Sequence, residues 1–338
     1  MDSISQIALG AAIGSAVLGH KVGYRAAVWG GILGTLPDLD VLISFGGPVA
    51  DFTYHRSFSH SLLVLAAVSP LLAWLIRKIH PQTAEYRQGW LVLVLLALIT
   101  HPLLDAFTIY GTQLFWPLDA APVGLGSIFI IDPLYTLPLL AGVIAFLCLR
   151  RRPHLGRRLN ATGLLLSSLY LVWSAGAQQW VEQKAERQLA ANDQLHRQLL
   201  VQPAPLNTLL WRVLVMTDEG YQQGFYSLFD RDRPIRLQAY PSQPELLEDI
   251  KLHWPVERLQ WFTKGFYKVE AAAGDIVISD LRMGIEPSYA FNFKVGEFGG
   301  STLVRPSADV QIASPRDMSR LPALWRRIWH YPNEGAEF

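Results

Sequence analysis

The stretch WLVLVLLALITHPLLDAFTIY, from Trp90 to Tyr110, decides how this chain folds. It is apolar for most of its length and long enough to cross a hydrocarbon core of roughly 30 Å as a helix. Its second half carries two ionisable residues, His101 and Asp105, which are costly inside a membrane and indicate a function there. Because they are four residues apart, they lie on one face of the helix. The stretch therefore predicts a membrane helix that carries a polar site.

The rest of the first half of the chain has the same character. In the 338 residues, charged side chains are scarce before about Gln179 and ordinary after it. We therefore predict a polytopic α-helical membrane domain over residues 1–180, followed by a small α+β soluble domain over residues 181–338. About six apolar segments are expected to span: Ile4–Leu18, Ala26–Phe45, Phe58–Ile79, Trp90–Tyr110, Gly126–Leu149 and Leu159–Trp180.

Lys and Arg residues predict the orientation of these segments. They gather after the first, third and fifth segments, whereas the connections between the others hold only Arg56. The positive-inside rule places the basic connections in the cytoplasm, so the N-terminus and the C-terminal half are expected outside. A cleaved signal peptide is not expected, because the first positive charges, Lys21 and Arg25, follow the first apolar segment. The sequence thus predicts a multi-pass protein of the inner (cytoplasmic) membrane with an extracytoplasmic C-terminal domain.

The second half shows short apolar runs separated by turn residues. A polar helical stalk is expected over Val181–Leu200, ended by Pro203 and Pro205. Strands are predicted at Leu209–Met216, Gly224–Phe229, Ile235–Tyr240, Asp275–Arg282 and Ala290–Val295. Helices are predicted at Pro244–His253, Pro255–Trp261 and Pro315–Trp329.

Composition excludes several classes of function. The formal net charge is +1, which gives no reason to expect a nucleic-acid partner. The single cysteine, Cys148, excludes an internal disulfide framework and a cysteine-based zinc site.

Several ionisable residues of the membrane half are expected at one depth, near the outer surface. Helices that run in opposite directions bring them there, and imidazole with carboxylate but no thiolate suits Zn²⁺, Mn²⁺ or Fe²⁺. We predict that one or two divalent metal ions, most simply zinc, are bound by Asp38, Asp40, His55, His60, His101 and Asp105. Asp132 is expected as a further ligand or general base, and Arg56 as a contact for an anionic substrate. Gln113 and Asp119, in the apolar loop after the fourth segment, could reach the same site.

Each of these residues alone also has a structural interpretation. Asp38, Asp40 or Asp132 could cap a helix, and His101 with Asp105 could be a hydrogen-bonded pair that joins two helices. His55 and His60 could be interfacial residues, and Arg56 could extend toward lipid headgroups. The shared depth favours a site over a series of separate structural roles.

The motifs resemble the YdjM-like family of membrane-bound metal-dependent hydrolases. The resemblance rests on Gly34-Thr35-Leu36-Pro37-Asp38-Leu39-Asp40, the His55–His60 block with Ser61, His101-Pro102-Leu103-Leu104-Asp105, Trp116-Pro117 and the opening Met1–Gln6. The C-terminal half looks like that of the longer members. The resemblance implies a hydrolase, and the His-x-x-x-Asp pattern is also similar to helical zinc phospholipase C and related nucleases.

The sequence therefore predicts a membrane-bound metal-dependent hydrolase. Its expected substrate is a phosphoester or a membrane lipid or lipid-linked molecule at the outer face of the membrane. One alternative is a transporter or metal-handling protein without hydrolytic activity, but the cytoplasmic halves of the segments carry few of the ionisable groups such a pathway needs. Another is a membrane-tethered binding module in which the C-terminal domain carries the function.

Overall fold

The computed structural model describes residues 1–118, 120–194, 198–299, 303–313 and 318–332. Its contacts divide the chain into two compact units. Unit 1 comprises residues 1–43 and 56–175, and unit 2 comprises residues 44–55 and 176–338. The short segment 44–55 therefore belongs with the C-terminal half of the chain, although it lies in the sequence of the N-terminal half.

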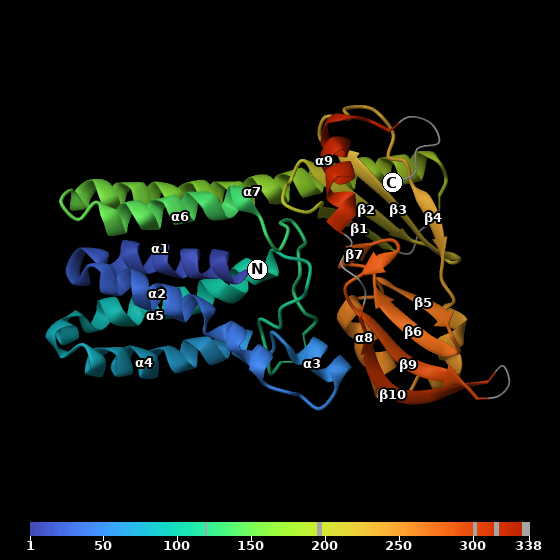
Figure 1. The fold of residues 1–338 in the computed structure, drawn as a ribbon, viewed down its shortest axis with the longest axis horizontal. Helices are drawn as coiled ribbons and strands as arrows, with labels where there is room; N and C mark the ends of the chain where they lie inside the picture. Colours follow the sequence, from blue (N-terminus) through green and yellow to red (C-terminus); the bar gives the residue numbers. More distant parts are fainter. Residues whose placement is uncertain (119, 195–197, 300–302, 314–317, 333–338) are drawn as a thin grey trace. The chain divides into compact units, whose positions relative to one another are not determined.

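Unit 1 is a set of helices that lie side by side (Figure 1). They are α1 (Ser3–Val22), α2 (Tyr24–Thr35), α4 (Leu62–Ile79), α5 (Arg87–Ala106), α6 (Pro133–Cys148) and the first part of α7 (Pro153–Ala191). Among the described residues, three segments are long and apolar enough to cross a membrane, namely Ser3–Val22, Leu62–Ile79 and Pro81–Ala106, and α6 is a shorter apolar helix. This confirms the predicted helical membrane region, while the prediction of six spans goes further than these three.

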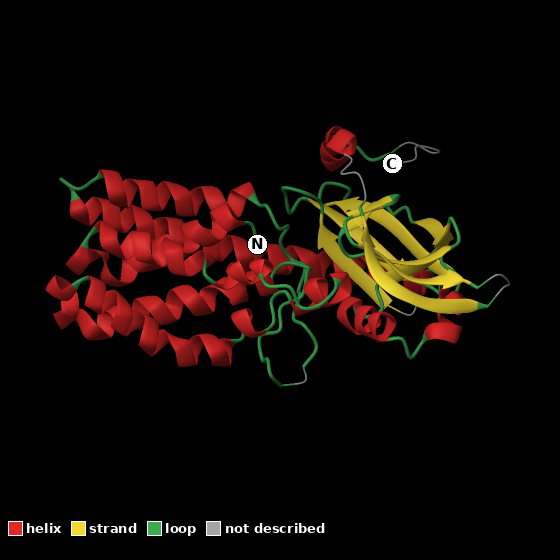
Figure 2. Cartoon of the chain, turned by 60° about the horizontal axis from the view of Figure 1, so that its bottom comes forward, coloured by secondary structure: helices red, strands yellow, loops and turns green. Residues whose placement is uncertain are grey.

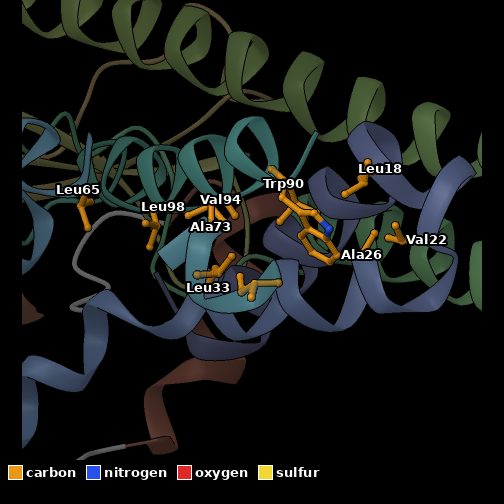
Figure 3. Close-up of a cluster of buried hydrophobic side chains, with 12 residues drawn as sticks. Leu18, Val22, Ala26, Leu33, Leu65, Ala73, Trp90, Val94 and Leu98 are labelled. Atoms are coloured by element: carbon orange, nitrogen blue, oxygen red, sulfur yellow. The ribbon is translucent and has the colours of Figure 1, made fainter. Parts of the chain in front are cut away.

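An apolar cluster holds α1, α2, α4 and α5 together. At its centre Trp90 of α5 is fully buried, and its Nε1 donates a hydrogen bond to Thr83 Oγ1 at 3.1 Å. Around it lie side chains of the other helices, including Leu18, Ala26 and Ala73 (Figure 3). An indole with its one donor satisfied can be buried at little polar cost.

Helices α1 and α2 approach each other at glycines spaced four residues apart. A Cβ built on Gly10 would lie 2.1 Å from the Gly30 carbonyl oxygen, and one on Gly30 would lie 2.1 Å from the Gly10 oxygen. A Cβ on Gly34, one turn further along α2, would lie 2.5 Å from the Gln6 carbonyl oxygen. Small residues at this spacing allow helix backbones to pack closely in a membrane.

Two predicted spans are shorter as helices than expected. The segment Ala26–Phe45 is α-helical only to Thr35, and Pro37–Leu42 forms the 3₁₀ helix η1. Pro37 lacks an amide hydrogen, so the α-helix cannot continue through it unchanged. The third segment becomes α-helical at Leu62, where Ser61 is the N-cap and its Oγ accepts from Val64 N at 3.3 Å, after the short 3₁₀ helix η2 (Phe58–His60).

Unit 2 is rich in β-structure, with two four-stranded antiparallel sheets (Figure 2). The first has the order β1-β2-β3-β4: β1 (Gln198–Pro203), β2 (Leu210–Met216), β3 (Gly220–Ser227) and β4 (Gln238–Pro241). The second has the order β10-β9-β6-β5: β10 (Val304–Ile312), β9 (Asn292–Phe298), β6 (Asp275–Asp280) and β5 (Tyr267–Ala272). The unit also contains the hairpin β7 (Gly284–Ile285) and β8 (Ser288–Tyr289), the later part of α7, and the short helices α3 (Pro48–Tyr54), η4 (Pro244–Ile250), α8 (Trp254–Thr263), η5 (Met318–Arg320) and α9 (Leu321–Trp329).

The predicted stalk is wrong in its second half. Helix α7 runs without a break to Ala191, and Gln198–Pro203 then forms strand β1 against β2. Pro203 lies at the end of this strand, and β1 is at the edge of its sheet, a position where proline is tolerated. The five predicted strands overlap β2, β3, β4, β6 and β9, and the helix predicted from Pro315 begins at Leu321, with residues 315–317 outside the described part of the chain.

Candidate metal centre

Four of the predicted ligands meet at one point in unit 1. Asp38 comes from η1, His60 from η2, and His101 and Asp105 from successive turns of α5. One ligand atom of each lies within 4.8 Å of all the others. His60, His101 and Asp105 are buried, whereas the Asp38 side chain keeps 22% of its surface exposed. The group could hold a metal ion, and it opens on the side of Asp38.

The distances within the group have the dimensions of a metal site. The two histidine Nε2 atoms are 3.1 Å apart. Asp38 Oδ1 lies 3.5 Å from His60 Nε2 and 3.4 Å from His101 Nε2, and Asp105 Oδ2 lies 3.2 and 3.4 Å from the same atoms. Ligands at zinc bond lengths in a tetrahedral arrangement lie roughly 3.3–3.5 Å from one another. The five separations therefore fit four ligands around one ion of this size.

Each imidazole is oriented through its other ring nitrogen. His101 Nδ1 lies 2.6 Å from the Gly34 carbonyl oxygen, at the end of α2. An Nδ1–H that donates to this carbonyl leaves the lone pair on Nε2, the atom that faces the group. His60 Nδ1 lies 2.9 Å from Ser59 Oγ and 3.8 Å from Asp40 Oδ2. Outer contacts of this kind are typical of histidines that bind metal.

The two oxygens of Asp105 have different surroundings. Oδ1 accepts from Gln6 Nε2 at 3.1 Å, contacts the Met1 amino group and lies 3.3 Å from an Arg56 guanidinium nitrogen. Oδ2 is buried, accepts no hydrogen bond from any described residue and faces the two imidazoles. A buried carboxylate oxygen without a donor is expensive unless a cation completes its environment. This oxygen, together with the two imidazoles and a second carboxylate, fits a divalent ion.

Asp40 and His55 are not part of this group. Asp40 Oδ2 accepts from Arg56 N at 2.9 Å and from Ser59 Oγ at 2.6 Å, so it contacts the residues around His60 and not the four ligand atoms. His55 is the last residue of segment 44–55, which belongs to unit 2. Four of the six predicted ligands therefore converge in this group.

Arg56 and Asp132 have structural contacts. The Arg56 side chain is buried, with Nη1 3.4 Å from Thr108 Oγ1 and the guanidinium over the Tyr110 ring at 4.9 Å, so it does not extend toward lipid headgroups. Asp132 caps α6 through Leu134 N at 3.0 Å and accepts from Tyr170 OH at 2.8 Å. The helix-cap interpretation of Asp132 accounts for both of its oxygens.

Gln6, which the sequence places at the outer start of the first apolar segment without deciding whether it joins the site, contacts one of the ligands. Its Nε2 donates to Asp105 Oδ1 and to the His101 carbonyl oxygen, 3.2 Å away. Gln6 is therefore positioned to support Asp105. Gln113, expected near the site, is buried, and its backbone N donates to the Arg56 carbonyl oxygen at 3.0 Å. Asp119 lies outside the described residues.

The fold and the site define a helical membrane protein with a buried His/Asp group that could hold a metal. Comparison with known proteins agrees with this class: the model of the YdjM inner membrane protein family matches residues 1–181, and the chain belongs to this family. The chain is also 30% identical over 150 residues to a Bacillus subtilis (strain 168) protein described as "Uncharacterized protein YfhP". That alignment covers 42% of this chain and 45% of the relative. No solved structure matches the chain.

Proposed function

We propose that this protein is a membrane-bound metal-dependent hydrolase whose ligands are Asp38, His60, His101 and Asp105. The convergence of these four side chains, at separations that fit one ion, is the observation that carries the proposal. Two carboxylates neutralise a divalent cation in a buried site, and two imidazoles favour zinc, with manganese or iron as alternatives.

When bound, such an ion polarises a phosphoryl or acyl oxygen and makes water a better nucleophile at neutral pH. The protein side chains supply the rest. Asp38 is the one member of the group with exposed surface, so substrate and water approach from its side. Its Oδ1 faces the imidazoles, which leaves Oδ2 as the carboxylate oxygen to accept a proton from the attacking water. Asp105 is held by donors on Oδ1 and keeps its position during the reaction.

The surroundings of Asp38 favour a lipid-type substrate. Apolar side chains next to it in the chain are strongly exposed: Leu39 at 53%, Val41 at 71% and Leu42 at 80%. An open polar group flanked by exposed apolar residues fits a molecule with a hydrolysable headgroup and an acyl or prenyl chain. We therefore propose a phosphoester or lipid-linked substrate that reaches the site from the membrane.

We also propose that the chain crosses the inner membrane six times, with the C-terminal half outside. The proposal rests on the basic connections after the first, third and fifth apolar segments. A periplasm-specific reporter enzyme fused to the C-terminus should be active, and activity of a cytoplasm-specific reporter in its place would reverse the topology.

The activity is tested with the purified full chain on panels of phosphomonoesters, phosphodiesters and lipid phosphates. We expect hydrolysis of at least one substrate, its loss on chelation and its return with Zn²⁺ or Mn²⁺. Asp105→Asn should abolish hydrolysis, as the chelator does, because the substitution removes a negatively charged ligand. The exposed residue Asp218 provides a matched control, and Asp218→Asn should keep full activity.

Two results would count against the proposal. Hydrolysis that resists both the chelator and Asp105→Asn would place the activity elsewhere. Tight metal binding without hydrolysis of any substrate in the panels would favour a metal-handling protein.

A further inference from the structure

Residues 44–55 lie in the chain between two of the ligands, Asp38 and His60. We call this segment the excursion, because it leaves unit 1 and packs in unit 2. It begins six residues after Asp38 and ends five residues before His60. The chain leaves unit 1 after Ile43 and returns to it at Arg56, and between these points it belongs to unit 2. Most of the segment is the short helix α3.

The inner face of α3 is part of the core of unit 2. Phe52 is 5% exposed, and its ring centroid lies 4.4 Å from that of Phe291, 4.8 Å from that of Phe262 and 5.2 Å from that of Phe293. Two of these aromatic residues come from α8 and β9, which lie more than 200 positions later in the chain. Val49 and Thr53 of α3 are fully buried as well.

Polar contacts fix the same helix to α8 and β10. The three elements are labelled in Figure 1. Arg258 Nε donates to Thr53 Oγ1 at 3.0 Å, and its guanidinium lies over the Tyr54 ring at 4.5 Å. At the start of α3, Val49 N donates to Asp309 Oδ2 at 2.7 Å. The segment is thus held by apolar, charged and hydrogen-bonded contacts at once, which is more than a loosely attached loop has.

The base of the excursion is joined to the metal group. Arg56 N donates to Asp40 Oδ2 across the two ends of the excursion, and Arg56 has a φ of +63°, a backbone conformation that side chains other than glycine rarely adopt. The Arg56 guanidinium lies 3.3 Å from Asp105 Oδ1. The excursion is therefore preceded in the chain by Asp38 and followed by His60. Arg56, the residue directly after it, contacts a third ligand, Asp105.

We propose that the C-terminal half of the chain positions the metal ligands through segment 44–55, with Phe52 as the main positioning residue. This inference rests on the metal site proposed above. Few residues separate α3 from Asp38 and His60, so a shift of α3 changes where these ligands sit. The C-terminal half thereby acts on the site without contributing a ligand.

The test compares the Zn²⁺ dissociation constants of full-length variants, measured by competition with a chromophoric chelator. Phe225 of β3 is a matched control, because it is a buried phenylalanine of unit 2, 5% exposed like Phe52, and packs in a different apolar cluster, with Leu210 and Leu324. We expect Phe52→Ala to weaken Zn²⁺ binding roughly 10–100-fold, the range seen when the support of metal ligands is removed. Phe225→Ala should leave the constant within about twofold.

A second readout and a second variant keep the inference falsifiable. In the Co²⁺-substituted protein the visible d–d bands report ligand geometry, and they should change in Phe52→Ala but not in Phe225→Ala. If Phe52→Ala does not fold, Arg258→Ala removes the contacts to Thr53 and Tyr54, together with the contact to the Trp261 ring of α8, and should shift the Zn²⁺ constant in the same direction. Equal Zn²⁺ constants in the Phe52 and Phe225 variants would overturn this inference alone, whereas a wild type that binds no Zn²⁺ would overturn the metal site itself.

Discussion

Asp38 and Asp40 are two residues apart and have different environments. Asp38 Oδ1 faces the imidazoles of the group. Asp40 Oδ2 instead accepts hydrogen bonds from Arg56 N and Ser59 Oγ and lies 3.8 Å from His60 Nδ1. One carboxylate is therefore placed as a ligand, and the other supports the residues that orient a ligand. This division gives a direct test at the scale of single residues.

Asp40→Ala should weaken metal binding without abolishing it. Loss of the Asp40 carboxylate releases Ser59 and the Arg56 amide, so His60 is less well oriented, which typically costs roughly 10–100-fold in metal affinity. Titration of the metal-free protein with Zn²⁺ measures this, and at saturation the variant should still take up as much zinc as the wild type. Complete loss of zinc would instead make Asp40 a ligand.

The residue types of the site could be predicted from the sequence, but their division of roles could not. His101 and Asp105 were predictable as a pair because helical spacing alone places them on one face. The roles of Asp38 and Asp40 depend on a 3₁₀ turn after Pro37, and those of His55 and His60 depend on where the chain changes units. Both features arise from tertiary contacts that a single sequence does not display.

The close packing of α1 and α2 positions one end of the site. Gly34 of α2 supplies the carbonyl oxygen that lies 2.6 Å from His101 Nδ1, and η1 with Asp38 follows directly. Gly30, one turn before it, and the facing Gly10 of α1 allow the backbones of the two helices to meet. The hairpin of these helices is therefore part of the support of the metal group.

Gly30→Ala should destabilise the protein and weaken its metal binding. The added methyl group would lie 2.1 Å from the Gly10 carbonyl oxygen, so the helices must separate, at a cost of about 1–3 kcal/mol. Gly176 of α7 is the matched control, because a Cβ there meets nothing within 4 Å, and Gly176→Ala should be neutral or stabilising by about 0.4–1 kcal/mol. Thermal unfolding in detergent compares the two variants, and equal unfolding temperatures would contradict the role of close packing.

The sequence predicted the central strands of the two four-stranded sheets but only one of their edge strands, β4. The edge strands β1, β5 and β10 were not predicted, and neither were the two-residue strands β7 and β8. Edge strands carry charged or proline residues and expose much of their surface, as β10 does with Arg305 and Pro306, so their apolar pattern is weak. Membrane helices are easier to predict than edge strands, because an apolar run of about twenty residues can be recognised in the sequence without any tertiary information.

At the scale of the whole molecule, the N-terminal sequence contributes to both units. The family match ends at residue 181, yet segment 44–55 inside the matched region packs into the unit formed by the later residues. A division of the sequence by composition alone cannot show this, because α3 is a short helix within a mainly apolar half. The C-terminal half and the metal group are thus joined at two places along the chain, through α7 and through segment 44–55.

The most direct test of the central claim is the metal content of the purified full chain, measured by elemental mass spectrometry on the wild type and on single histidine variants. We predict about one divalent ion per wild-type chain, a value that four converging ligands support. His60→Ala and His101→Ala should lose the ion, whereas the variant of an exposed histidine at the end of α1, His20→Ala, should retain it. Equal metal content in all three variants would contradict the account.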